Sequence, residues 1–298
     1  MFGLELRDLA VLAVAVDDDG RVVSRAEAPI DSSGRAEDAA FEALGKLVDP
    51  PRSTTVLGVA AQSPESPVCQ AMIRALATRY AGPFVQTGAD GAGGAAAAAE
   101  AWVGAARGAR HVAFLSAAEH ATAGILRDGE PMFGAHRRAP AVSWLALNPV
   151  EREDYRKIGC FEAEVASAGI VRRLVWRVKT GDHSSVHDAV GGHLSAITSD
   201  HVLAAAREGD GVAISVMRDT AKYLGMAAAN LVLVADPEIL VLGGIMASAA
   251  DLLVDSVRSE IARRLPPAML EPLKIATAAL GDDAAAIGAA RLAAAAHP

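Results

Sequence analysis

The sequence predicts an α/β fold, in which buried strands alternate with helices along the whole chain. Aliphatic runs of strand length, such as 9–16 and 239–242, are bounded by turn residues. Segments with a helical spacing of apolar residues, such as 36–48, lie between such runs. A hydrophobic content of 52% over 298 residues is enough to bury a sizeable core, and this length suggests one large or two ordinary domains.

The first part of the chain is expected to begin with a hairpin. Residues 9–16 and 21–28 are its strands, because Asp and Gly at 17–20 favour a tight turn. Pro50 and Pro51 stop the helix at 36–48. The next expected elements are a strand at 54–60, a helix at 66–79 and an extended segment at 83–85.

The second part is expected to open with a helix at 94–106, since Ala is the best helix former. A strand at 111–116 and a hairpin turning at Asp128 and Gly129 follow it. Helices dominate 162–233 before the strand at 239–242, and a helix of small residues at about 284–295 closes the chain.

The charge balance argues against several classes of partner. Lys and Arg number 28 against 36 Asp and Glu, so a net charge of −8 supplies no basic surface for nucleic acid. The sequence contains no apolar stretch that predicts a membrane span and no signal-peptide pattern at its start. Cys69 and Cys160 cannot make a disulfide framework and suit a reducing compartment. We therefore expect a cytoplasmic protein without nucleic-acid or membrane partners.

Four segments carry a resemblance to a known family. A buried strand ends in Gly243 and Gly244, where glycine tolerates positive φ and leaves room for a ligand. The segment 280–290 places a glycine turn and two carboxylates before a small-residue helix. With 104–110 and 159–167, these segments resemble the ROK family of sugar kinases and sugar-responsive repressors, and the likeness extends over nearly the whole chain.

The resemblance implies an actin-like ATPase (ribonuclease H-like) fold of two lobes with a cleft between them. The first lobe would comprise 1–108 plus 285–298, and the second 109–284. Gly243 and Gly244 would lie on the adenosine side of a bound ATP. Pairing through the second lobe would make the protein a homodimer, and the small and aliphatic residues of the helices within 163–233 could form the contact.

The two phosphate loops of the family are altered here. The pattern G-x-D-x-G-G-T falls on 3–9, where Glu5, Arg7 and Asp8 bring side chains to a place that suits backbone N–H groups. The second loop falls on 117–124 and retains only its last glycine, while Glu119 adds a negative charge. Both segments predict a poor phosphate cradle.

The family's catalytic Asp is also replaced. Counting back from Glu100, the family's Asn-Asp pair falls on Gly91 and Ala92. Asp90 could act as a relocated base if the glycine-rich loop shifts by two residues, or it could cap a helix. Glu119 and His120 could form a new acid/base pair, but only on a turn, because neighbouring residues of a strand point to opposite faces.

The zinc and sugar motifs are depleted as well. Trp144 falls where the family has a zinc-binding His, and Glu153 and Tyr155 fall on two of its Cys, so the resemblance implies no zinc at Cys160. We expect the Trp144 ring, capped by Tyr155, to fill the volume of the metal. Glu162 is the one sugar-type ligand left, unless it serves only as a carboxylate at a helix N-terminus.

These departures favour a sugar-kinase-like protein that has lost catalysis and acts as a ligand-binding or regulatory module for a small, sugar-like molecule. The ligand-binding residues expected in such a module are Glu5, Arg7, Asp8 and Glu162. Direct DNA binding is not expected, because the first strand begins at Met1, without the winged helix of the family's repressors. The alternative is an enzyme. It would be either an ATP- and Mg-dependent sugar kinase with a relocated base, or a catalyst of another reaction. The candidate groups of such an enzyme are Glu5, Asp8, Asp90, Glu119 and His120.

Overall fold

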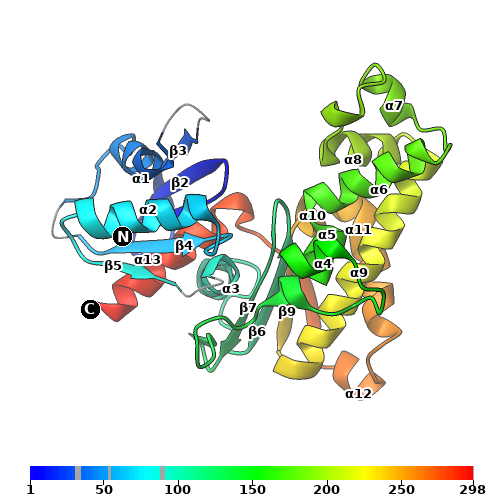
Figure 1. Cartoon of the computed structure of the whole chain (residues 1–298). Coiled ribbons are helices and arrows are strands. Elements are labelled where there is room, and N and C mark those ends of the chain that lie inside the picture. The colour runs from blue at the N-terminus through cyan, green and yellow to red at the C-terminus, as the bar shows by residue number, and fades with distance from the viewer. Residues whose placement is uncertain (31–34, 53–54, 88–90, 298) are drawn as a thin grey trace.

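The computed structural model describes residues 1–30, 35–52, 55–87 and 91–297. They form a mixed α/β structure with two five-stranded sheets, each covered by helices (Figure 1). The strand order is β3-β2-β1-β4-β5 in one sheet and β10-β9-β6-β7-β8 in the other. We call each sheet with the helices that cover it a lobe, the first lobe being the one that contains β1.

The first sheet combines an antiparallel meander with two parallel strands. Its strands are β1 (Phe2–Leu6), β2 (Ala10–Val16), β3 (Val22–Pro29), β4 (Leu57–Ala61) and β5 (Phe84–Gln86). Val11 and Ala13 face α1 (Ala36–Gly45) and α2 (Pro67–Arg79), whereas Leu12 and Val14 face α13 (Ala284–Ala296). The alternation of these apolar residues along β2 buries both faces of the sheet.

The second sheet is built around β6, which pairs antiparallel with β7 and parallel with β9. Its strands are β6 (Val112–Ala117), β7 (Ala121–Arg127), β8 (Glu130–Pro131), β9 (Ile239–Gly244) and β10 (Lys274–Thr277). Asp128 and Gly129 both have positive φ, at 55° and 86°, which makes the tight turn between β7 and β8 that the sequence predicts.

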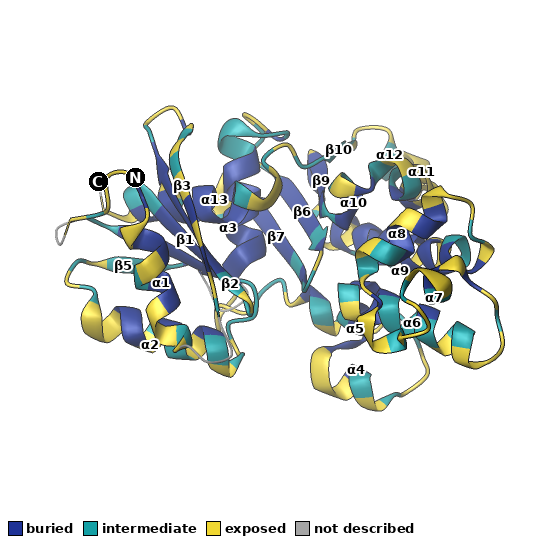
Figure 2. Ribbon diagram, turned by 90° about the horizontal axis from the view of Figure 1, so that it is seen from above, coloured by how far each residue is buried: buried dark blue, intermediate teal, exposed yellow. Residues whose placement is uncertain are grey.

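Helices of the second lobe cover the sheet on the side away from the first lobe (Figure 1). They are α4 (Glu153–Ile158), α5 (Cys160–Val165), α6 (Ser167–Lys179), α7 (Ser185–Ala189), α8 (Ser199–Arg207), α9 (Gly211–Ala235), α10 (Ile245–Ser248), α11 (Ala250–Ala262) and α12 (Pro267–Leu270). Figure 2 shows the central strands of both sheets as buried, with exposed residues on the edge strand β3 and on the outer faces of the helices. Among the described residues, no helix has both the length and the apolar character needed to cross a membrane.

The helices α3 (Gly91–Val103) and α13 cross between the two sheets (Figure 1). They approach closely because small residues face one another: a Cβ on Gly288 would lie 1.7 Å from the Ala95 carbonyl oxygen. A Cβ on Gly93 would likewise lie 2.1 Å from the carbonyl oxygen of Ala123 on β7. These contacts fix α3 against the second sheet and so position the floor of the cleft. The lobe boundaries at 108/109 and 284/285 stay a prediction.

Candidate functional site in the interlobe cleft

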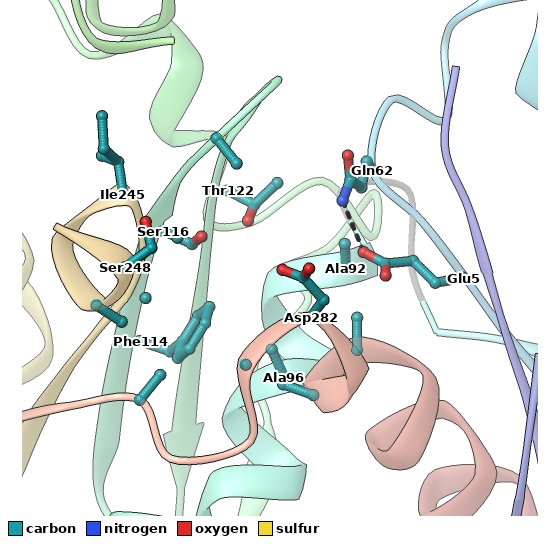
Figure 3. Close-up of a pocket in the computed structure, with 18 of the residues that line it drawn as sticks. Glu5, Gln62, Ala92, Ala96, Phe114, Ser116, Thr122, Ile245, Ser248 and Asp282 are labelled. Atoms are coloured by element: carbon teal, nitrogen blue, oxygen red, sulfur yellow. Dashed lines mark hydrogen bonds between the residues drawn. The ribbon is translucent and has the colours of Figure 1, made fainter. Parts of the chain in front are cut away.

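A cleft of about 580 Å³ lies between the two lobes (Figure 3). On one side it is lined by the β9–α10 turn with Gly243, Gly244 and Ser248. The opposite side carries polar side chains from the first sheet and from the segment that precedes α13. They are Glu5, Arg7, Gln62 and Asp282.

The glycine pair at the end of β9 is required by the protein itself. Gly244 has φ of +58°, and a Cβ there would lie 2.2 Å from the Ala117 carbonyl oxygen. A Cβ on Gly243 would lie 2.7 Å from the Phe114 ring. The positive φ agrees with the sequence interpretation, but the space left by the missing side chains is occupied by β6. Both glycines still line the cleft, so their place beside an adenosine stays a prediction.

Glu5, which is buried, and Arg7, which is partly buried, form an ion pair where the first phosphate loop of the family would lie. Arg7 Nη2 donates to Glu5 Oε2 at 2.6 Å and also to the Asp282 carbonyl oxygen at 2.9 Å. Gln62 Nε2 donates to Glu5 Oε1 at 2.8 Å, as Figure 3 shows. Burial raises the pKa of Glu5, although Arg7 and Gln62 oppose that effect. The positive charge of Arg7 is therefore already compensated.

His120 lies in the turn between β6 and β7 and makes two contacts with carboxylates. Its Nδ1 is 3.0 Å from Glu162 Oε1 on α5, and its Nε2 is 3.0 Å from Asp8 Oδ2 in the β1–β2 turn. Burial alone would lower the pKa of His120, but its hydrogen bonds to Glu162 and Asp8 and their charges raise it to about 9. An imidazolium between two carboxylates thus joins the lobes, and we call Asp8, His120 and Glu162 the interlobe bridge.

Both carboxylates of the interlobe bridge are held from outside it. Glu162 Oε2 accepts hydrogen bonds from Ser143 Oγ at 2.9 Å and from the Ala121 backbone N–H at 3.2 Å. Asp8 Oδ1 accepts from Ser66 Oγ at 2.8 Å. Ser66 is also the N-cap of α2, since its Oγ accepts from the Cys69 backbone N–H. The bridge is therefore built on fixed secondary structure in each lobe.

The structure brings Glu119 close to the interlobe bridge without pairing it to His120. Glu119 and His120 do lie on a turn, as their proposed cooperation requires, but the ring nitrogens face Asp8 and Glu162. One ligand atom from each of Asp8, Glu119 and His120 lies within 4.8 Å of the others, and Glu119 is exposed. Sequence reasoning missed the bridge because its members are 112 and 42 residues apart.

The position that the resemblance assigns to the general base holds a methyl group. Ala92 is buried in the first turn of α3 and lines the cleft beside Glu5 (Figure 3). Glu100, from which this position was counted, is buried and accepts hydrogen bonds from the Ala279 and Leu280 backbone N–H groups. Asp90, the candidate relocated base, lies outside the described residues.

The structure contradicts the expected role of Trp144. Its side chain is 57% exposed and cannot fill a buried metal volume. Tyr155 is buried, but its Oη donates to Glu164 Oε1 at 2.6 Å. Arg152 and Arg173 also donate to the Glu164 carboxylate, at 3.0 and 3.2 Å. A polar network around one buried carboxylate stabilises this segment where an apolar ring was predicted.

The donor set in this segment does not fit the zinc site that the resemblance suggests. Cys160 packs with Tyr155, Ala163 and Leu147. The described residues place no group of three metal-ligating side chains at this thiol. A structural zinc needs four ligands of the Cys or His type.

Comparison with known proteins assigns the chain to a family. The sequence model of the ROK family matches residues 75–296, which is well over half of the sequence. The chain belongs to the ROK family. The fold agrees: a ROK family glucokinase from Streptomyces griseus, solved in complex with glucose and AMPPNP, superposes with a TM-score of 0.81 at 22% identity and 99% coverage of both chains. The two-lobed, actin-like architecture that the sequence predicts is thereby confirmed.

Relatives of this ROK protein include both enzymes and regulators. A glucokinase from Halalkalibacterium halodurans is 29% identical over 195 residues, which are 65% of this chain and 59% of that enzyme. A xylose repressor from Caldicellulosiruptor bescii is 27% identical over 205 residues, covering 67% of this chain and 50% of the repressor. The chain thus matches only half to three fifths of the length of these relatives. A sugar-kinase-like or a regulatory role fits a family with both kinds of member.

Proposed function

We propose that this ROK protein binds a small, sugar-like molecule in the interlobe cleft and acts as a binding or regulatory module, without phosphorylating a sugar. The observation that carries the absence of phosphorylation is the use of Glu162. The one sugar-type carboxylate left by the family resemblance already binds His120, Ser143 and the Ala121 backbone N–H. A group committed to three partners is a poor ligand for a sugar hydroxyl that must be positioned for attack.

The polar groups at the end of the cleft where the family's first phosphate loop would lie also oppose catalysis. Phosphoryl transfer depends on positive or dipolar groups that face the transferring oxygens. Here Arg7 is paired with Glu5, and Asp282 lies against the same space. The phosphates of ATP with Mg²⁺ therefore do not fit this end of the cleft, whose carboxylates would repel them. Ala92 leaves no carboxylate at the expected position to accept a proton from a hydroxyl.

The rest of the cleft supports ligand binding. Its volume of about 580 Å³ falls within the range of small-molecule sites. Hydroxyl side chains from strands and helices of the second lobe line it, and they suit a polyhydroxylated ligand. They are Ser116, Thr122, Ser167, Ser199 and Ser248. Relatives named as a glucokinase and a xylose repressor support a sugar as the first class to test.

Calorimetric titration combined with a coupled kinase assay tests the proposal. We expect binding of at least one member of a panel of glucose, mannose, xylose, N-acetylglucosamine and N-acetylmannosamine, and no phosphoryl transfer to any of them from Mg-ATP. Ser116→Phe should abolish that binding by filling the cleft, whereas Ser259→Phe on the exposed face of α11 should not. Turnover of about one per second, in the ordinary range of enzymes, would contradict the proposal.

The alternative is an enzyme that works in the same cleft. The observation in its favour is the gathering of Asp8, Glu119 and His120 at the edge of the cleft, beside Ala118 and Thr122, which line it. A relocated base at Asp90 is the kinase form of this alternative. Sugar phosphorylation that Asp90→Asn abolishes would favour it over a binding role.

A further inference from the structure

We propose that Asp8, Glu119 and His120 form a binding site for a divalent transition-metal ion that joins the two lobes. One ligand atom of each residue already lies within 4.8 Å of the other two. Asp8 comes from the turn after β1, and the other two residues come from the turn after β6. The site is independent of whether a sugar binds in the cleft.

The orientation of His120 is the first argument. Metal-binding histidines commonly donate one ring N–H to a carboxylate, which fixes the ring and leaves the other nitrogen for the metal. Glu162 holds Nδ1 at 3.0 Å and is itself held by Ser143 and Ala121. Nε2 is thereby directed at Asp8 Oδ2. Glu162 is thus a positioning residue for the proposed ligand nitrogen.

The spacing of the ligand atoms is the second argument. Nε2 of His120 and Oδ2 of Asp8 are 3.0 Å apart, with the shared hydrogen between them. Two ligand atoms about 2.0–2.1 Å from one tetrahedral ion lie about 3.3 Å from each other, so the ion could replace this hydrogen after a shift of a few tenths of an ångström. Ser66 holds the other oxygen of Asp8 and would keep the carboxylate oriented. Glu119, being exposed, can rotate to supply the third ligand.

The local charge is the third argument. Asp8, Glu119 and Glu162 place three carboxylates around one imidazole. Within the described part of the chain, no Lys or Arg forms an ion pair with any of the three, and nearby Arg7 is paired with Glu5. This excess of negative charge favours a divalent cation. A donor set of one imidazole and two carboxylates suits Zn²⁺, Co²⁺ or Mn²⁺ better than Mg²⁺ or Ca²⁺, which prefer oxygen ligands throughout.

Cobalt binding to the metal-stripped, full-length protein provides the test. We expect one equivalent of Co²⁺ to give visible absorption typical of a site with nitrogen and oxygen ligands, and Zn²⁺ to displace it. His120→Ala should abolish the signal, and Glu119→Gln should weaken binding at least 10-fold. Glu162→Gln should weaken it about 10–100-fold, the usual effect of removing a group that orients a ligand.

Matched controls separate this site from others on the chain. His187→Ala alters a partly exposed histidine four residues after His183, and it should leave the Co²⁺ signal unchanged. A signal that survives His120→Ala but is lost in His187→Ala would overturn the proposal. So would a thiolate-to-cobalt charge-transfer band, which would place the ion at a cysteine. Absence of stoichiometric binding at 100 µM Co²⁺ and at 100 µM Zn²⁺ would overturn it as well. Glu119 is exposed, so Glu119→Gln should fold. This variant therefore still tests the proposal if His120→Ala fails to fold.

Discussion

Asp8 of the first lobe and Glu162 of the second lobe each place one oxygen 3.0 Å from a nitrogen of the same imidazole, that of His120. Loss of this ring would leave two partly buried carboxylates without their shared donor. The relationship therefore links the stability of the molecule to the contact between its lobes.

His120→Ala is expected to lower the free energy of unfolding by about 1–3 kcal/mol, because each carboxylate loses a charged hydrogen-bond donor while remaining partly desolvated. Urea denaturation in the presence of a chelator measures this effect without a contribution from bound metal. His136→Ala, at an exposed position, is the control and should change stability by less than about 0.5 kcal/mol. Equal stability of the two variants would contradict a structural role for the bridge.

Replacing Glu164 is expected to destabilise the protein more than replacing the larger residue Trp144. Glu164→Ala should destabilise the protein by about 3–5 kcal/mol, since it leaves the largely buried Arg173 without its carboxylate partner. Trp144→Ala should change stability by less than about 0.5 kcal/mol, because its ring is mostly exposed. Thermal or urea unfolding of both variants checks the pair. A larger loss in Trp144→Ala would restore the apolar explanation of this segment.

Local signals allowed much of the fold to be predicted. Ser66 and Pro67 mark the start of α2, and the aliphatic run before Gly243 marks β9, so both elements lie where they are expected. β10 has only four residues with little apolar character, and it is a strand because it pairs with β9. No local pattern could reveal it.

The candidate site was predicted only as a set of separate residues. Glu5, Arg7 and Asp8 were chosen as ligands for an outside molecule, but the first two bind each other and Asp8 binds His120. Such pairings depend on which turns the two sheets bring together. Local sequence patterns do not show how far apart two turns lie in the folded protein. Trp144 was expected to fill the volume of the family's metal because it falls on a zinc-ligand position, whereas the structure leaves its ring mostly exposed.

Gly93 and Gly94 are neighbours in α3 with different surroundings. Gly93→Ala should destabilise the protein by about 1–3 kcal/mol or more, because the new Cβ would lie 2.1 Å from the Ala123 carbonyl oxygen, which the β-sheet holds in place. Gly94→Ala is the matched control. Its Cβ would meet only the Phe133 ring at 3.3 Å, and Ala favours the helix, so its stability should stay within about 1 kcal/mol of the wild type. Melting curves of the two variants give the comparison, and a well-tolerated Gly93→Ala would show that α3 can move away from β7.

A homodimer formed through the second lobe is expected in solution. Trp176 on α6 is 62% exposed, and a large aromatic side chain on the surface is typical of a contact between chains. Light scattering coupled to size exclusion should give the mass of two chains at micromolar concentration, and Trp176→Glu should shift it toward one. A single-chain mass for the wild type would contradict the prediction. A dimer unaffected by Trp176→Glu would place the contact elsewhere.

Restoring a carboxylate at the position of the general base should not restore kinase activity. A general base contributes on the order of 10²–10⁴ in rate and a phosphate-binding donor about 10²–10³, so each is needed. In Ala92→Asp the new carboxylate would lie beside buried Glu5, with Asp282 facing the same space, and this concentration of negative charge disfavours a bound triphosphate (Figure 3).

A coupled assay with Mg-ATP should detect no turnover on glucose, mannose, N-acetylglucosamine or N-acetylmannosamine. If Ala92→Asp alone reached about one turnover per second, the missing base would be the only defect, and the surroundings of Glu5, Arg7 and Glu119 would have to be compatible with phosphoryl transfer.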